Sequence, residues 1–265
     1  MLLVSIYSFA QKLPNKQEVS MRAPSNIKID GKATEWDNKF QAHNDATGVS
    51  YTMANDDENL YLVIQTLDYN IVDKIVAMGA TLTIQKMGKS NPTGAVSITY
   101  PTSTTLSFSN SRDRIARKDT SAKTTDSLMR DYNARLGRQC KQIGVHGIKD
   151  MDTLISAYNE DGIKVACLFS NKQSFTLELS VSLKQLGLTA ADGAKFAYHL
   201  KLNGKKLLAM KMDINNVRMG DTGLPPGPEI DKAELQASMD HLMSSIAQRD
   251  GPTDFWAEYT LAKKP

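Results

Sequence analysis

Three acidic residues stand together in the run Asp56-Asp57-Glu58, between two segments rich in β-forming residues. Carboxylate oxygens are the ligands that Ca²⁺ prefers, so this run is a candidate calcium site. Calcium-binding loops usually space their ligands alternately around a glycine, and this run does not. A turn whose side chains hydrogen-bond their own backbone is therefore the favoured interpretation.

The histidines and cysteines form no recognisable metal or redox motif. The four histidines share no metal-ligand spacing; they are His43, His146, His199 and His241. Cys140 and Cys167 lack C-x-x-C spacing, which argues against a zinc or redox site. In an oxidising compartment the two cysteines could pair, but their spacing does not show whether they meet. Cys167 lies in an apolar run, where a free buried thiol is an equal alternative.

Motifs of the common enzyme classes are absent from the sequence. It contains no nucleophile elbow, zinc-protease helix, phosphate-binding loop or dinucleotide fingerprint. Glycosidase carboxylates pair in space rather than in sequence, and nothing in the chain selects such a pair. We therefore expect no catalytic residue and no enzymatic activity. An enzyme whose site is assembled from the middle of the chain is kept as an alternative.

Composition and charge narrow the class of protein. The chain has 265 residues, of which 41% are hydrophobic and 23% charged, which is typical of a folded protein. Its formal net charge of +3 gives no reason to expect a nucleic-acid partner, because phosphate binding needs clustered Lys and Arg.

The first ten residues are apolar, with Ser8 and Ala10 near their end. Such a run is too short to span a bilayer, which takes roughly 20 apolar residues. It matches the apolar core and cleavage region of a secretory signal peptide. We therefore expect an extracytoplasmic protein, periplasmic or secreted, with no transmembrane segment and with residues 1–10 as a signal peptide remnant. A buried N-terminal strand is the alternative.

Short runs of β-forming residues separated by turn signals cover most of the chain. They predict strands at 26–30, 49–54, 60–67, 80–85, 95–100, 163–169, 174–181, 196–202, 206–213 and 254–261. Asn203-Gly204 favours a hairpin between the strands at 196–202 and 206–213.

Helical spacing of apolar residues predicts three helices, at 70–78, 121–141 and 230–248. Strands and helices do not alternate regularly, which argues against a doubly wound sheet. The elements together predict a mainly β fold, an antiparallel β-sandwich of jelly-roll type. We expect it to form a single domain over 11–265, with helical insertions near 121–141 and 230–248.

The N-terminal third and the last strand carry a family pattern. Asn26-Ile27-Lys28-Ile29-Asp30-Gly31 is followed by Glu35-Trp36 and then by Ala54-Asn55-Asp56-Asp57-Glu58-Asn59-Leu60-Tyr61-Leu62. The chain closes on Asp254-Phe255-Trp256-Ala257-Glu258-Tyr259. This pattern resembles the I-x-I-D-G-x-x-x-E-W opening, the D-x-x-N-L-Y-L segment and the closing strand of the family 9 carbohydrate-binding modules. It also resembles their DOMON-like relatives, which include secreted bacterial proteins.

The resemblance implies a non-catalytic module that binds glycans by stacking aromatic rings on sugar faces, in a fold that calcium often stiffens. It places Trp36 and Trp256 on framework positions, so we expect both in the core, with Asp30 and Gly31 as a structural turn. The ligand-binding aromatics of the family have no clear match, and the candidates here are Tyr69, Tyr100, Tyr132 and Tyr158. An envelope structural or interaction protein that keeps the sandwich without a sugar site is the second hypothesis.

Overall fold

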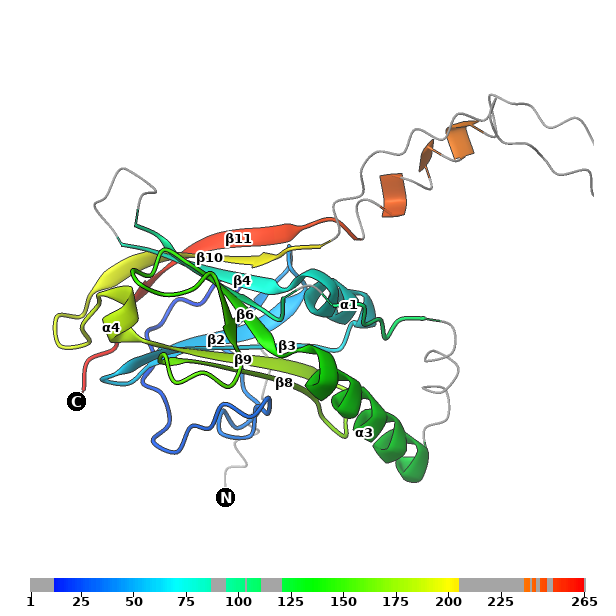
Figure 1. Cartoon of the computed structure of the whole chain (residues 1–265), viewed down its shortest axis with the longest axis horizontal. Coiled ribbons are helices and arrows are strands. Elements are labelled where there is room, and N and C mark those ends of the chain that lie inside the picture. Colours follow the sequence, from blue (N-terminus) through cyan, green and yellow to red (C-terminus); the bar gives the residue numbers. More distant parts are fainter. Residues whose placement is uncertain are drawn as a thin grey trace, which may run out of the picture.

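The computed structural model describes residues 12–86, 94–102, 104–110, 121–204, 236–238, 240–241, 244–246 and 250–264. Within these ranges, two antiparallel sheets pack face to face as a β-sandwich (Figure 1). Sheet A contains, in spatial order, β1 (Ala42–Asn44), β2 (Val49–Asn55), β3 (Asn59–Thr66), β9 (Phe175–Ser182) and β8 (Ile163–Phe169). Sheet B contains β11 (Thr253–Thr260), β10 (Lys195–Leu202), β4 (Ala80–Lys86), β5 (Val96–Tyr100), β6 (Gln142–His146) and β7 (Leu154–Ser156). The predicted fold class is confirmed.

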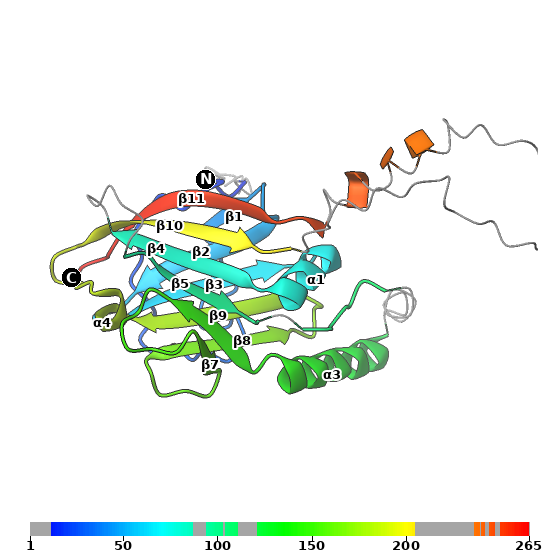
Figure 2. The ribbon, with the colours of Figure 1, turned by 45° about the horizontal axis from the view of Figure 1, so that its top comes forward.

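The described helices lie at the two ends of the sandwich (Figures 1 and 2). At one end are α1 (Tyr69–Met78) and α3 (Ala122–Gln139), which begin after the N-cap side chains of Asp68 and Ser121. At the other end α4 (Leu183–Leu186) lies near the C-terminus. In the part of the chain that is described, no helix combines the length and apolar character needed to cross a membrane.

Side chains that alternate along the strands fill the space between the sheets. Sheet A contributes Tyr51, Leu62 and Leu179, and sheet B contributes Leu82 and Tyr198, all of them buried. Because side chains point to opposite faces every second residue, each strand offers a second set of residues to its outer face. The two sheets differ in whether these outer-face residues are covered by another segment.

The outer face of sheet A is covered. Residues 21–40, here called the N-terminal segment, pack on it through a second apolar cluster that includes Trp36, Tyr61 and Val63. Residues on both faces of β9 are therefore buried. Along β4, β5 and β10 buried residues alternate with more accessible ones, as expected for a sheet with one open face. None of the described segments lies over the outer face of sheet B (Figure 2).

The sequence prediction of strands fails at two places. Residues 26–30 form turns and irregular backbone, because the Asp30 and Gly31 N–H groups bind the Glu178 side chain instead of a strand. Both edges of β10 are taken, by β4 and β11, so the hairpin predicted between 196–202 and 206–213 is wrong. Residues 206–213 and 1–10, and most of the helix predicted at 230–248, lie outside the described residues.

Candidate functional site

The outer face of sheet B carries an exposed tryptophan. Trp256 lies in β11, an edge strand, and is 45% exposed. Its register partner on β10 is His199, and the two rings are parallel, with centroids 4.5 Å apart and planes inclined by 2°. Because the imidazole covers one face of the indole, the exposed area belongs to the other face and the ring edges. We call Trp256 and His199 the stacked pair.

The expectation that Trp256 is a core residue is wrong. Side chains of β11 alternate between the core and solvent, and the inward positions are taken by Phe255 and Tyr259, which are 7% and 4% exposed. Trp256 directly follows Phe255, and successive side chains of a strand point to opposite faces, so Trp256 points outward.

Charged side chains flank Trp256 along its strand. Asp254 and Glu258 lie two residues before and after it, so all three point to the same face. The Glu258 carboxylate lies 2.6 Å from Lys195 Nζ, and Asp254 Oδ1 lies 3.3 Å from His199 Nε2. The rise of a strand separates each carboxylate from the indole by about 7 Å along β11. Each carboxylate thus has a basic side chain of β10 beside it.

Hydroxyl groups extend this face toward the middle of sheet B. The register partner of His199 in β4 is Thr83, and the partner of Thr83 in β5 is Ser97. The Thr83 and Ser97 side chains hydrogen-bond to each other at 2.8 Å. Beside them, Thr81 and Thr99 hydrogen-bond at 2.7 Å. An aromatic surface next to carboxylates and hydroxyls can stack on a sugar ring and exchange hydrogen bonds with its hydroxyl groups.

The four candidate tyrosines lie elsewhere. Tyr100 is 4% exposed and its hydroxyl donates to the Cys140 carbonyl, while Tyr132 is fully buried, so neither ring has a face for a ligand. Tyr69 stacks on Phe169 at the α1 end, with centroids 5.7 Å apart. Tyr158 is 76% exposed and follows β7, at the opposite edge of sheet B from Trp256. Ligand contact by Tyr69 or Tyr158 stays a prediction.

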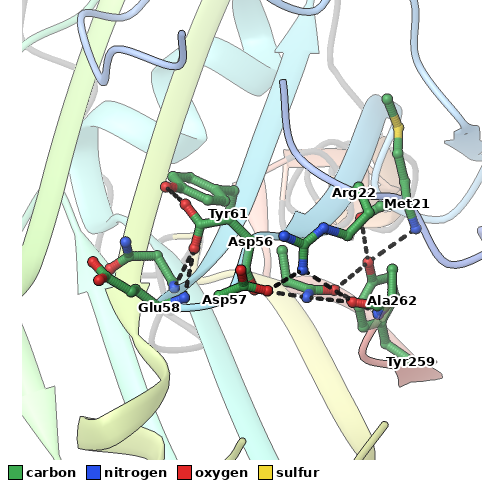
Figure 3. A network of polar contacts seen from close by, with 10 residues as sticks. Met21, Arg22, Asp56, Asp57, Glu58, Tyr61, Tyr259 and Ala262 are labelled. Carbon is green, nitrogen blue, oxygen red and sulfur yellow. Dashed lines mark hydrogen bonds and ion pairs between the residues drawn. The ribbon is translucent and has the colours of Figure 1, made fainter. Parts of the chain in front are cut away.

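Asp56 acts as the acceptor of the turn between β2 and β3 (Figure 3). Its Oδ1 accepts hydrogen bonds from the N–H groups of Glu58 and Asn59 at 2.8 and 2.6 Å, and its Oδ2 accepts one from the Tyr61 hydroxyl at 2.6 Å. Burial alone would raise the pKa of Asp56, but the Tyr61 hydroxyl and the two N–H groups lower it overall. This contact is the Asx-type turn favoured from the sequence.

Asp57 ties the same turn to the N-terminal segment. It lies 2.8 Å from the Arg22 guanidinium, which also donates to the Ala262 carbonyl at 3.3 Å (Figure 3). Among the residues described, no three His, Cys, Asp or Glu side chains are grouped so that they could hold a metal ion. Calcium binding by the acidic run stays a prediction, whereas its contacts to the surrounding backbone are part of the fold.

Trp36 and the Asp30-Gly31 turn meet on one buried carboxylate, Glu178 in β9. Trp36 Nε1 donates to Oε1 at 3.0 Å, and the Asp30 and Gly31 N–H groups donate to Oε2 at 3.0 and 2.8 Å. Glu178 is 1% exposed; burial raises its pKa, and the three donors oppose that rise. Glu178 was not among the predicted site residues, although it is the one acidic residue in a strand of apolar and small polar residues, which was a signal of its role.

Hollows also occur away from the stacked pair. One, of about 260 Å³, lies between the N-terminal segment and sheet A and is lined by Ile27, Lys28 and Tyr61 among others. The second, of about 1140 Å³, lies at the α4 end and is lined by both apolar and charged residues, among them Leu183, Leu188 and Lys184. Neither lining includes an exposed aromatic ring, so neither offers the stacking surface that Trp256 does.

Comparisons with known proteins give a distant structural similarity and no match in sequence. No family model matches the chain, and no curated protein matches it. A solved structure of a "putative carbohydrate-binding protein" from Bacteroides uniformis is 9% identical, with a TM-score of 0.35 over 72% of this chain and 85% of that one. Because a TM-score this low does not establish a shared fold, what that protein binds carries no weight for this chain.

Proposed function

We propose that this chain is an extracytoplasmic, non-catalytic carbohydrate-binding module whose sugar site is the outer face of sheet B around Trp256. The exposed, stacked indole is the observation that carries the proposal. The face of an indole is electron-rich, and the C–H groups on one side of a sugar ring are its complement. His199 holds the indole in one orientation, which reduces the entropy lost when a sugar stacks on it.

The neighbouring polar side chains suit a neutral glycan. Carboxylates accept hydrogen bonds from sugar hydroxyls, and the Lys195 ammonium group donates them. Because Glu258 is paired with Lys195 and the register partner of Asp254 on β10 is Lys201, no single sign of charge dominates around Trp256. We therefore expect neutral sugars to bind better than acidic ones.

We also propose kinship with the family 9 modules and their DOMON-like relatives. The motif residues Asp30, Gly31 and Trp36 support it, because all three bind the same carboxylate and so serve one structural contact. The irregular backbone at 26–30 is a departure from a strand at this position. A single apolar core shared by both sheets supports one domain over 11–265.

The proposal is tested by screening the protein on a glycan array, with and without Ca²⁺, and then measuring affinities by calorimetry. We expect Trp256→Ala to weaken binding about tenfold or more, since loss of a stacked aromatic costs on the order of 1.5 kcal/mol. Leu67→Ala is the matched control, because Leu67 is 67% exposed and lies between β3 and α1, outside sheet B. We expect this variant to bind like the wild type.

Two results would overturn the proposal. The first is no binding of any glycan at millimolar concentration, near −4 kcal/mol, which would favour the envelope interaction protein. The second is wild-type affinity in Trp256→Ala, most clearly if Tyr158→Ala abolishes binding at the opposite edge of sheet B.

A further inference from the structure

Two cysteines, one just before a strand of sheet B and one in sheet A, lie near the same hydroxyl group. Cys140 is the C-cap residue of α3 and leads into β6 of sheet B, whereas Cys167 lies in β8, an edge strand of sheet A. The Tyr100 hydroxyl contacts both residues: it donates to the Cys140 carbonyl at 3.1 Å and lies 3.8 Å from Cys167 Sγ. Both cysteines are free in this structure.

The segments that carry the two cysteines are also in contact, because Asn133 of α3 hydrogen-bonds the Phe169 N–H and carbonyl of β8 at 2.7 and 2.9 Å. The nearby Cys140 side chain, together with burial, raises the pKa of the Cys167 thiol. Cys140 itself is 6% exposed. A disulfide requires its two Cβ atoms to lie roughly 4 Å apart. The contacts of both residues with the Tyr100 hydroxyl bring their backbones near enough for this approach to be tested.

We propose that Cys140 and Cys167 form a disulfide that ties sheet B to sheet A. The reaction is exchange with a disulfide donor, either a small molecule such as oxidised glutathione or a protein. One cysteine thiolate attacks the donor and releases one donor thiolate. The second cysteine thiolate then attacks the mixed disulfide and releases the other. The two cysteines lose two protons and two electrons, and the donor is reduced to two thiols.

The position of the bond gives it a structural effect. The ladders of hydrogen bonds run within each sheet, and β7 and β8 are edge strands of different sheets. A bond from residue 140 to residue 167 closes a loop that contains β6 and β7. It stabilises the fold because it lowers the conformational entropy of the unfolded chain. Because Cys140 is buried in the folded protein, we expect the bond to form while the core is still open.

The test determines whether the two cysteines are oxidised after the protein has refolded. Reduced, denatured protein is refolded in a glutathione redox buffer, denatured again and treated with iodoacetamide. We expect a mass lower than that of the reduced chain by two hydrogen atoms, no alkylated cysteine, and one crosslinked peptide joining Cys140 to Cys167. The thermal midpoint of the oxidised protein should lie roughly 5 to 10 °C above that of the reduced protein.

Cys140→Ser and Cys167→Ser serve as matched variants. The thermal midpoint of each variant should equal that of the reduced wild type and should not change when reductant is added. Should a variant fail to fold, the wild type with and without reductant still decides the question. Two alkylated cysteines in the refolded monomer, or a thermal midpoint that does not change on reduction, would overturn the proposal.

Discussion

Glu178→Gln is expected to lower the free energy of unfolding by about 2 to 4 kcal/mol. Both carboxylate oxygens of Glu178 accept hydrogen bonds, Oε1 from Trp36 and Oε2 from Asp30 and Gly31. A glutamine places an NH₂ group at one of these positions in either orientation, where it faces an N–H donor. At 1% exposure no solvent can satisfy the groups left unpaired.

Urea unfolding followed by tryptophan fluorescence measures this loss. The substitution preserves side-chain volume, so a cavity cannot account for a loss of stability. Glu160→Gln is the matched control, because Glu160 is exposed, and we expect a change within about 0.5 kcal/mol. Hydrogen exchange should become faster in the N-terminal segment of Glu178→Gln before it does so in sheet B. Equal stability of Glu178→Gln and the control would contradict the role given to this carboxylate.

Gln17→Ala is expected to destabilise the protein by roughly 3 kcal/mol. Strand β1 pairs with β2 only from Val49 to Tyr51, which leaves Met53 without a partner from that strand. The Gln17 amide fills the gap: its Oε1 accepts from the Met53 N–H at 2.7 Å, and its Nε2 donates to the Met53 carbonyl at 2.8 Å. Without the amide, two polar groups of a fully buried residue lose their partners.

Gln17→Glu separates lost hydrogen bonds from lost volume. The carboxylate keeps the size of the side chain and can accept from the Met53 N–H, but it cannot donate to the carbonyl. We therefore expect Gln17→Glu to be destabilised in urea unfolding as well, whereas Glu18→Ala, at an exposed position beside it, should be neutral. A Gln17→Glu variant as stable as the wild type would contradict the pairing with Met53.

Local patterns predicted most of the sandwich. Strands β4, β5, β8 and β9 follow from alternating apolar residues on both sides of polar runs, and in the structure β4 pairs with β5 and β8 with β9. Strands β1, β6 and β7 have only three to five residues, too few for an alternation to stand out. The strand predicted at 26–30 fails because its backbone partner is Glu178, a side chain almost 150 residues away that no local pattern reveals.

The candidate site shows where a family pattern misled. The sequence indicated which side chains of β11 face the core, because apolar Phe255 and Tyr259 alternate with polar Asp254 and Glu258. That alternation puts Trp256 on the polar face, whereas the framework position in the resemblance favoured the core. The neighbours of Trp256 across the sheet could not be predicted, since the β10–β11 register joins segments separated by about 50 residues.

The most direct test of a sugar site at Trp256 is the response of the two indole N–H signals in a ¹⁵N–¹H correlation spectrum. The glycan found by array screening is titrated into labelled protein, and Trp256→Phe assigns the two signals. We predict that the Trp256 signal shifts with the saturation curve measured by calorimetry, while the signal of Trp36, buried on Glu178, stays in place. A glycan that binds and leaves the Trp256 signal unmoved would contradict the proposed site.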